Sequence, residues 1–271
     1  MIKALFRYWS TTEGRHLPSL ALIVAALFMV LTTENQFKRA GHTPLSDQLK
    51  VVSSQDQLVP TLFTAAELQY LEKRFGVHGP QPQLAQLFTQ GIDQFEFIRS
   101  HTIHRIDLLK PIILSKSKLY KVNPMLVTAI LFDEIQHSTP GEDHPLLAHS
   151  GLVKTYGLAQ LGISELIHQK RLPKNPTAKQ IAQARDLLLD PESNIELLAG
   201  KIARLKNELN LPAENMLQAS NSYRHAKAIA TLAYLHNGKL DYPARVLRYM
   251  RDPELHGIIY SQRSQTKLPI I

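Results

Sequence analysis

The feature that most constrains the fold of this chain is the spacing of its apolar residues, which recur every three or four positions from about residue 61 onward. Apolar positions repeat with that period on one face of an α-helix, whereas a half-buried strand alternates every second residue. Convincing alternating runs are absent. The sequence therefore predicts an all-α domain over residues 61–271. The clearest helix face is formed by Ile195, Leu198, Ile202, Leu205 and Leu209.

Helix boundary signals support this prediction. A capping box satisfies backbone N–H groups at a helix start, and proline fits the first helical position because its missing N–H is not needed there. Glycine after the last turn ends a helix. These signals are the TAAE and TAKQ segments at 64–67 and 177–180, Asn123-Pro124, Pro191, Gly76 and Asn237-Gly238. Within the helical pattern of residues 81–120, Gly91 and Pro111 predict interruptions.

The first 33 residues predict a membrane anchor. Lys3, Arg7 and Arg15 flank an uncharged apolar run over residues 17–31, and a helix of that length spans about 22 Å. No small-residue cleavage site follows the run, which favours an uncleaved anchor, with a cleaved, secreted form as the alternative. The basic flank is then cytoplasmic and the rest of the chain is exported. The polar residues 34–60 form a tether ahead of the helical domain.

Charge and composition narrow the classes of partner. The chain contains no cysteine, which excludes thiol chemistry, disulfides and cysteine-based zinc sites. Its net charge is +8, and removing the three basic residues and one acidic residue of positions 1–33 leaves +6, so the helical domain favours anionic partners. The lysines of residues 110–121 do not form an aromatic-interleaved pattern, and an exported domain does not meet intracellular nucleic-acid duplexes, so we expect no nucleic-acid partner. His101 and His104 lack a third ligand, and we expect no metal or cofactor.

A carboxylate lies on an apolar helix stripe in the segment that follows Asn123-Pro124. Val127, Ile130, Leu131 and Glu134 fall at helical spacing, so Glu134 points into the core or into a groove in it. A carboxyl group in apolar surroundings resists ionisation and can stay protonated near neutral pH, as a general acid requires. The alternative is a helix that ends near this position, with the carboxylate in solvent.

Glu134 also belongs to a larger pattern. Four segments follow one another over about half of the chain: KVNPMLVTAILFDE, SGLVKTYGLAQLG, LLLDPESNIELLAGKI and IATLAYLHNG. Together they resemble the lytic transglycosylase and goose-type lysozyme family, in which a helix with an Asn/Asp-Pro start carries the catalytic glutamate. GLMQ-like, DPxxNI and AYNAG-like segments follow it there. The matching positions here are Asn123-Pro124 with Glu134, residues 157–160, residues 189–191 with Asn194-Ile195, and Ala233-Tyr234 with Asn237-Gly238.

The resemblance implies a lysozyme-like fold with a catalytic core over about residues 110–245, and a peptidoglycan-cleaving activity without a cofactor. In this family the glutamate protonates the oxygen between N-acetylmuramic acid and N-acetylglucosamine. It then acts as base on the muramic 6-hydroxyl, which leaves an anhydro end; Glu134 takes this role here. The substrate-binding residues that the resemblance implies are Gln160, Tyr156, Gly157, Leu158, Tyr234 and Asn237. Packing roles for Tyr156 and Tyr234 and a helix C-cap role for Asn237 are the alternatives.

The chain also departs from the family pattern. Ile135 stands where the family has a serine after the glutamate, and Ala159 replaces a methionine. The AYLHNG segment is one residue longer than AYNAG, and the loop over residues 138–150 is longer than expected. These departures leave an alternative open, a non-catalytic, membrane-anchored protein that binds the cell wall or takes part in its assembly. The expected partners are peptidoglycan glycan strands, the inner membrane and an envelope-spanning protein complex, with the domain in the bacterial periplasm.

Hydrolysis, the more common glycosidase chemistry, needs two carboxylates. The candidates for the second one are Asp133, Glu142 and Asp143. Asp133 is expected at the edge of the apolar stripe, on the wrong side of the helix to face Glu134 across a sugar. The other two belong to the loop over residues 138–150, so hydrolysis stays an alternative. We expect Glu134 to work alone.

Overall fold

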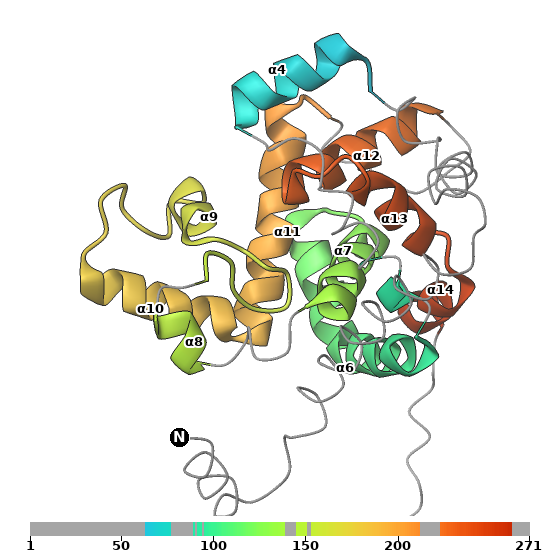
Figure 1. The fold of residues 1–271 in the computed structure, drawn as a ribbon, viewed down its shortest axis with the longest axis horizontal. Coiled ribbons are helices and arrows are strands. Elements are labelled where there is room, and N and C mark those ends of the chain that lie inside the picture. Colours follow the sequence, from blue (N-terminus) through green and yellow to red (C-terminus); the bar gives the residue numbers. More distant parts are fainter. Residues whose placement is uncertain are drawn as a thin grey trace, which may run out of the picture. The chain divides into compact units, whose positions relative to one another are not determined.

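The described part of the chain consists of helices joined by turns and loops. The computed structural model describes residues 63–76, 89, 91–93, 95–138, 145–150, 153–211 and 223–261, all within one compact unit. Its helices are α4 (Ala65–Phe75), α6 (Glu96–Tyr120), α7 (Pro124–His137), α8 (Pro145–Ser150), α9 (Ile163–His168), α10 (Ala178–Leu189), α11 (Pro191–Glu208), α12 (Tyr223–Asn237), α13 (Tyr242–Tyr249) and α14 (Pro253–Tyr260). Strands are absent from these residues, and one isolated β-bridge pairs Tyr156 with Leu161. The predicted all-α class is therefore confirmed (Figure 1).

Helix α7 lies at the centre of this part, where α6, α11, α13 and α14 contact it (Figure 1). It begins as predicted, because Asn123 accepts a hydrogen bond from the Met125 N–H at 2.8 Å and Pro124 occupies the first helical position. Residues 124–133 are buried on every side. The sequence predicted burial of one apolar face only. Residues 124–133 are instead buried on all faces, because four helices surround α7.

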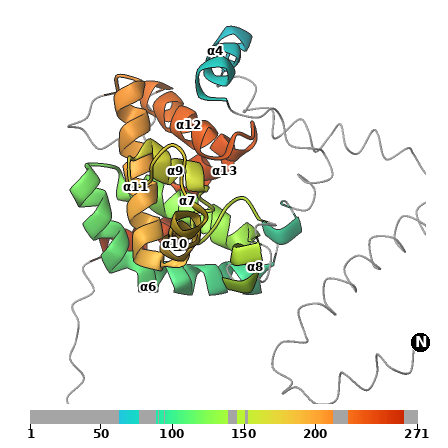
Figure 2. The same ribbon diagram turned by 90° about the vertical axis from the view of Figure 1, so that its left-hand side faces the viewer.

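The interruption predicted at Pro111 is wrong, because helix α6 continues through this residue. Proline lacks the N–H group that would bond to the carbonyl of Asp107, and its ring pushes against that carbonyl. The helix accommodates this by changing direction along its length (Figure 2). Ile106 and Ile113 are fully buried on either side of Pro111 and hold both halves of α6 to the core.

Helices α8, α9 and α10 form a group to one side of α11, on the left of Figure 1 and nearest the viewer in Figure 2. α10 and α11 begin at predicted signals: residues 177–180 form the capping box, and Asp190 accepts a hydrogen bond from the Ser193 N–H at 2.8 Å. The apolar face of α11 is buried from Ile195 to Leu205. α11 thereby connects the α8–α10 group to the central α7.

The GLAQ turn, which covers residues 156–161 and has the Tyr156–Leu161 bridge at its ends, is fixed by one side chain, the buried amide of Asn194 in α11. Its Oδ1 accepts a hydrogen bond from the Ala159 N–H at 2.8 Å, and its Nδ2 donates to the carbonyls of Tyr156 and Leu188 at 3.1 and 2.8 Å. Gly157 lies so close that a Cβ there would meet the Leu188 carbonyl oxygen at 2.1 Å, and its φ of +71° favours glycine. The GLAQ and DPxxNI segments are therefore joined by hydrogen bonds.

Helix α12 ends at Asn237 as predicted, because Gly238 adopts a left-handed conformation with φ +82°. The Gly238 N–H donates to the Tyr234 carbonyl at 2.7 Å. The chain then turns into α13, which packs against both α12 and α7. This turn brings the end of α12 and the start of α13 to Glu134, in the C-terminal half of α7.

Several predicted segments fall beyond what the structure describes. The anchor over residues 1–33, the tether over 34–60 and part of the loop over 138–150 lie outside the described residues. Among the residues that are described, no helix combines the length and apolarity needed to cross a membrane. The anchor therefore stays a prediction.

We expect Asn194→Ala to destabilise the fold by about 3 kcal/mol, because it leaves three buried backbone groups without their hydrogen-bond partner. Urea unfolding followed by circular dichroism measures this loss as a lower midpoint at an unchanged m-value. Asn207→Ala, on the exposed face of the same helix, is the matched control and should change the free energy of unfolding by less than about 0.5 kcal/mol. Equal midpoints for the two variants would contradict the role of Asn194.

Candidate active site

The carboxyl group of Glu134 is the centre of a polar cluster in the C-terminal half of α7. Its Oε1 atom accepts hydrogen bonds from Asn237 Nδ2 at 3.1 Å and from the Tyr242 hydroxyl at 2.9 Å. The Nε2 atom of His236 lies 3.4 Å from the same oxygen. Side chains from α12 and α13 therefore converge on one oxygen of a residue in α7.

Glu134 is the one residue from position 124 to 136 that is not buried, with 12% of its side-chain surface exposed. Among the described residues, its Oε2 atom has no hydrogen-bond partner. Because Oε1 is contacted by donors, Oε1 is held as the accepting oxygen, and the proton of the neutral acid goes to Oε2. Oε2 is thus the oxygen that can exchange a proton.

Tyr242 is a permanent donor to this carboxyl group. The residue is fully buried, with its ring 5.9 Å from that of His236 and 5.3 Å from the guanidinium carbon of Arg245. Burial raises the pKa of the Tyr242 hydroxyl well above its usual value, and the negative charge of Glu134 adds to this effect. The hydroxyl therefore keeps its proton at neutral pH and donates a hydrogen bond to Oε1.

A second set of contacts leads from His236 to α11. Lys201 Nζ lies 3.3 Å from Nδ1 of His236 and donates to the His236 carbonyl at 3.0 Å. Burial lowers the pKa of His236, and the charge of Lys201 lowers it further, so the ring is neutral at pH 7. Burial also lowers the pKa of Lys201 to about 8, although the carboxylates of Glu165 and Glu134 oppose this shift.

Asp133, expected at the edge of the apolar stripe, is instead buried and bonded to α13. Its side chain is 2% exposed, and Arg245 donates to both of its oxygens, Nε to Oδ1 at 2.7 Å and Nη2 to Oδ2 at 3.1 Å. Burial alone would raise the pKa of Asp133, but hydrogen bonds from His137 and Arg245 outweigh it and lower the pKa. Asp133 is therefore an ionised structural partner of α13. The other candidates for a second carboxylate, Glu142 and Asp143, lie outside the described residues.

The last turn of α7 carries an ion-pair cluster around His137. Its Nε2 lies 3.0 Å from Oδ1 of Asp93, and its Nδ1 lies 3.5 Å from Oδ2 of Asp133. Burial disfavours protonation of His137, yet the two carboxylates outweigh burial and raise its pKa to about 9. Asp93 also accepts hydrogen bonds from Arg248 at 2.6 Å and from the Tyr249 hydroxyl at 3.1 Å. The cluster fastens α13 to the end of α7.

The GLAQ turn makes its hydrogen bonds within itself and with neighbouring helices. Tyr156 is buried, and its hydroxyl donates to the backbone carbonyl three residues earlier at 2.8 Å. The Gln160 amide bonds back to the Gly157 carbonyl at 3.2 Å, and Leu158 is buried. The structure thus gathers these four predicted site residues in one turn. Within the described part of the chain, none of them hydrogen-bonds to Glu134.

The two predicted site residues of the AYLHNG segment have different positions. The Tyr234 ring is fully buried against Phe63, with 5.6 Å between ring centroids. Its hydroxyl has no hydrogen-bond partner among the described residues, so Tyr234 packs in the core rather than at Glu134. Asn237 both ends α12 and donates directly to Glu134.

Sequence reasoning missed three residues of the cluster, His236, Tyr242 and Lys201. His236 lies in the segment that is one residue longer than the family's AYNAG, and this extra length is the one signal that could have drawn notice. Tyr242 at the start of α13 matches no motif. Lys201 lies at the edge of the apolar face of α11, where a lysine commonly reaches solvent. Their convergence follows from tertiary packing alone.

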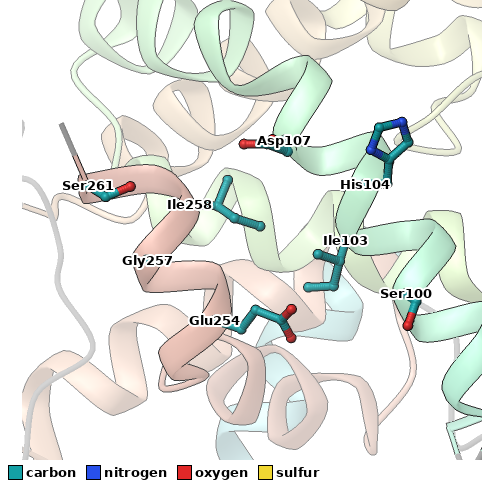
Figure 3. Close-up of a pocket in the computed structure, with 8 residues that line it drawn as sticks. All are labelled: Ser100, Ile103, His104, Asp107, Glu254, Gly257, Ile258 and Ser261. Atoms are coloured by element: carbon teal, nitrogen blue, oxygen red, sulfur yellow. The ribbon is translucent and has the colours of Figure 1, made fainter. Parts of the chain in front are cut away.

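A surface pocket of about 550 Å³ lies between the first half of α6 and α14 (Figure 3). Its lining includes Ile103, His104 and Glu254, and Glu254 pairs with Arg99 at 2.9 Å. The pocket shares no residue with the Glu134 cluster. Over the described ranges, no group of three or more histidine and acidic side chains is placed to hold a metal ion.

No protein-family model, curated protein or solved structure matches the chain. The functional assignment therefore rests on the chemistry of the Glu134 cluster and on the four sequence segments. Hydrogen bonds join these segments in pairs, GLAQ to DPxxNI through Asn194 and the helix of Glu134 to AYLHNG through Asn237.

We expect the stability contributed by His137 to be lost as the pH rises from about 6 to about 10. A group whose pKa is raised on folding stabilises the protein fully below its unfolded value of 6.5 and loses this contribution as the pH passes its folded value of about 9. The shift corresponds to about 3 kcal/mol at the acidic end of this range. Urea unfolding of the parent chain and His137→Gln across the range should show a difference that shrinks with pH.

His101→Gln serves as the control for this series, because His101 is exposed on α6. It should change the free energy of unfolding little at any pH. A difference between His137→Gln and the parent chain that stays constant from acid to alkaline pH would contradict the ion-pair role of His137.

Proposed function

We propose that the chain is a lytic transglycosylase that cleaves peptidoglycan, with Glu134 as its general acid and base. The proposal implies a lysozyme-like fold in the bacterial periplasm behind an inner-membrane anchor over residues 1–33. The observation that carries it is the Glu134 carboxyl group: donors from α12 and α13 hold Oε1, while Oε2 has no hydrogen-bond partner among the described residues. Such a group is oriented for proton transfer through a single oxygen.

The pairing of the buried acids with arginine favours the transglycosylase reaction over hydrolysis. Hydrolytic glycosidases use two carboxylates on opposite sides of the scissile bond. The two buried acids of the described part are bonded to arginine, Asp133 to Arg245 at 2.7 Å and Glu165 to Arg204 at 2.8 Å. A single carboxyl group that first gives and then takes a proton needs no second carboxylate.

In the proposed reaction, Oε2 of Glu134 gives its proton to the oxygen between N-acetylmuramic acid and N-acetylglucosamine, and the bond from this oxygen to C1 of the muramic acid breaks. The acetamido group of the substrate stabilises the cationic C1 centre. The Glu134 carboxylate then takes the proton of the muramic 6-hydroxyl, whose oxygen bonds to C1. The enzyme returns to its starting state, and the products are a free glucosamine hydroxyl and an anhydro end.

Tyr242 supplies a hydroxyl at Glu134 that Ile135 cannot supply. The family pattern has a serine directly after the glutamate, whereas Ile135 here is a buried apolar residue. The Tyr242 hydroxyl donates to Glu134 at 2.9 Å from another helix. The carboxyl group thus keeps a hydroxyl partner, which favours an enzyme over the non-catalytic alternative.

Charge also supports this choice of substrate. Peptidoglycan glycan strands carry peptide carboxylates, and a chain with net charge +8 attracts such anionic polymers. Glycan strands are therefore the proposed partner of the Glu134 site. The inner membrane and an envelope-spanning protein complex are the other partners that we propose.

Glu134→Gln tests the assignment, because glutamine keeps the shape of the side chain and removes the proton that is transferred. We expect the full chain, in detergent, to release muropeptides with anhydro ends from purified peptidoglycan, as measured by mass spectrometry. The variant should lose at least roughly a hundredfold in rate. Glu192→Gln, which changes an exposed acid of α11 paired with Lys116, is the matched control and should keep the parental rate.

Two outcomes would count against this proposal. Hydrolysed rather than anhydro ends would contradict the single-carboxylate reaction. No release by the parent chain or by Glu134→Gln, with both still sedimenting on cell walls, would select the non-catalytic cell-wall-binding protein.

We expect Tyr242→Phe to lower kcat by roughly tenfold or more, because it removes one of the donors that hold Oε1 of Glu134. The measurement is the rate of muropeptide release at saturating peptidoglycan, with circular dichroism to confirm the fold. Tyr120→Phe removes a hydroxyl that bonds to Glu196 of α11 and serves as the control. A parental rate in Tyr242→Phe would show that this hydroxyl has no part in the reaction.

A further inference from the structure

Lys201 and His236 form a connected pair behind Glu134 for which the proposed reaction has no step. Nε2 of His236 lies 3.4 Å from Oε1 of Glu134, and Nδ1 lies 3.3 Å from Lys201 Nζ. A neutral imidazole carries its proton on one nitrogen only. The nitrogen that carries it decides whether His236 gives a hydrogen to Oε1 or presents a lone pair to it.

The ammonium group of Lys201 determines this choice. An ammonium group donates hydrogen bonds and accepts none, so Nδ1 of His236 has to present its lone pair. Lys201 also donates to the His236 carbonyl at 3.0 Å, which fixes the two residues relative to each other. Burial and the charge of Lys201 lower the pKa of His236, so a second ring proton is disfavoured. The single proton is therefore on Nε2, which faces Glu134.

We propose that Lys201 is a positioning residue for Glu134: by fixing the Nε2–H tautomer of His236, it keeps Oε1 as an acceptor and the transferable proton on Oε2. With the other tautomer, Nε2 would present a lone pair and draw the proton of the carboxylic acid onto Oε1. The catalytic consequence rests on the proposed function, whereas the tautomer itself does not.

Charged groups from the surrounding helices act on this pair as well. Burial has the largest effect on the pKa of Lys201 and lowers it. Glu165 of α9 and Glu134 of α7 raise this pKa, Arg204 of α11 lowers it, and the resulting value is about 8. Glu165 is itself bonded to Arg204. On the α13 side, Arg245 is engaged by Asp133. Above about pH 8 Lys201 loses its charge, can accept a hydrogen bond, and no longer imposes the tautomer.

Nitrogen-15 NMR of the full chain labelled at histidine reads the tautomer directly, since protonated and unprotonated ring nitrogens have well-separated shifts. The signals of His236 are identified by their loss in His236→Gln. We expect a protonated Nε2 and an unprotonated Nδ1 at neutral pH in the parent chain, and a mixture of tautomers in Lys201→Met. Lys201→Arg keeps a cationic donor and should retain the parental pattern. A protonated Nδ1 in the parent chain, or unchanged shifts in Lys201→Met, would overturn the inference.

The pH profile of muropeptide release is the second readout. We expect the parental rate to fall as the pH rises through about 8. Lys201→Met should lower kcat by roughly tenfold or more and abolish the fall, whereas Lys201→Arg should move it to higher pH. His137 also titrates on the alkaline side, with a pKa of about 9, so the comparison among Lys201 variants assigns the fall. Lys206→Met removes another ammonium group of α11, which bonds to the Lys121 carbonyl, and as the control should keep the parental profile.

The failure of this inference and the failure of the proposed function are distinguishable. If the parent chain releases no muropeptides, the proposed function fails, and the NMR experiment still decides the tautomer of His236. If release depends on Glu134 while Lys201→Met keeps both the parental ring-nitrogen shifts and the parental pH profile, only the positioning role of Lys201 fails.

Discussion

The burial of α7 is the constraint on which the rest of the structure depends. A helix that is covered over most of its length leaves little solvent for its polar side chains, so these have to find partners inside the protein. Near its C-terminal end α7 carries four such side chains, Asp133, Glu134, Gln136 and His137. Arg245 and Asp93 bond to three of them. Glu134 alone is held by uncharged donors, so its carboxyl group is not committed to an ion pair with arginine.

The difference between charged and uncharged partners gives adjacent residues opposite roles. Arg245 stabilises Asp133 as a carboxylate, which removes that group from proton exchange near neutral pH. Asn237 and Tyr242 donate to Glu134 without carrying a positive charge, so they orient the group without forming an ion pair with it. The absence of an arginine partner among the described residues therefore distinguishes Glu134 from Asp133 as much as its own donors do.

The helices follow largely from local sequence signals, because caps and apolar spacing act within a few residues of the chain. The TAAE and TAKQ capping boxes and the end of α12 lie where the sequence predicts them. The interruption predicted at Pro111 was wrong because buried isoleucines on either side hold α6 together. This is an effect of packing and not of local preference. The donors to Glu134 come from 103 and 108 positions further along the chain. A single sequence carries no signal for such contacts. Asn237 was predicted as a site residue only because it belongs to the AYLHNG segment.

Tyr242 and Arg245 lie three residues apart on α13, and they bond to consecutive residues of α7, Glu134 and Asp133. Separating Arg245 from Asp133 would strand a buried charge, which is costly. A tilt of α13 that withdrew Tyr242 from Glu134 would strain this ion pair as well, so the two contacts are mechanically coupled. The ion pair between Arg245 and Asp133 therefore holds the carboxyl group of Glu134 in a fixed orientation, and this orientation does not require another segment to close over the site.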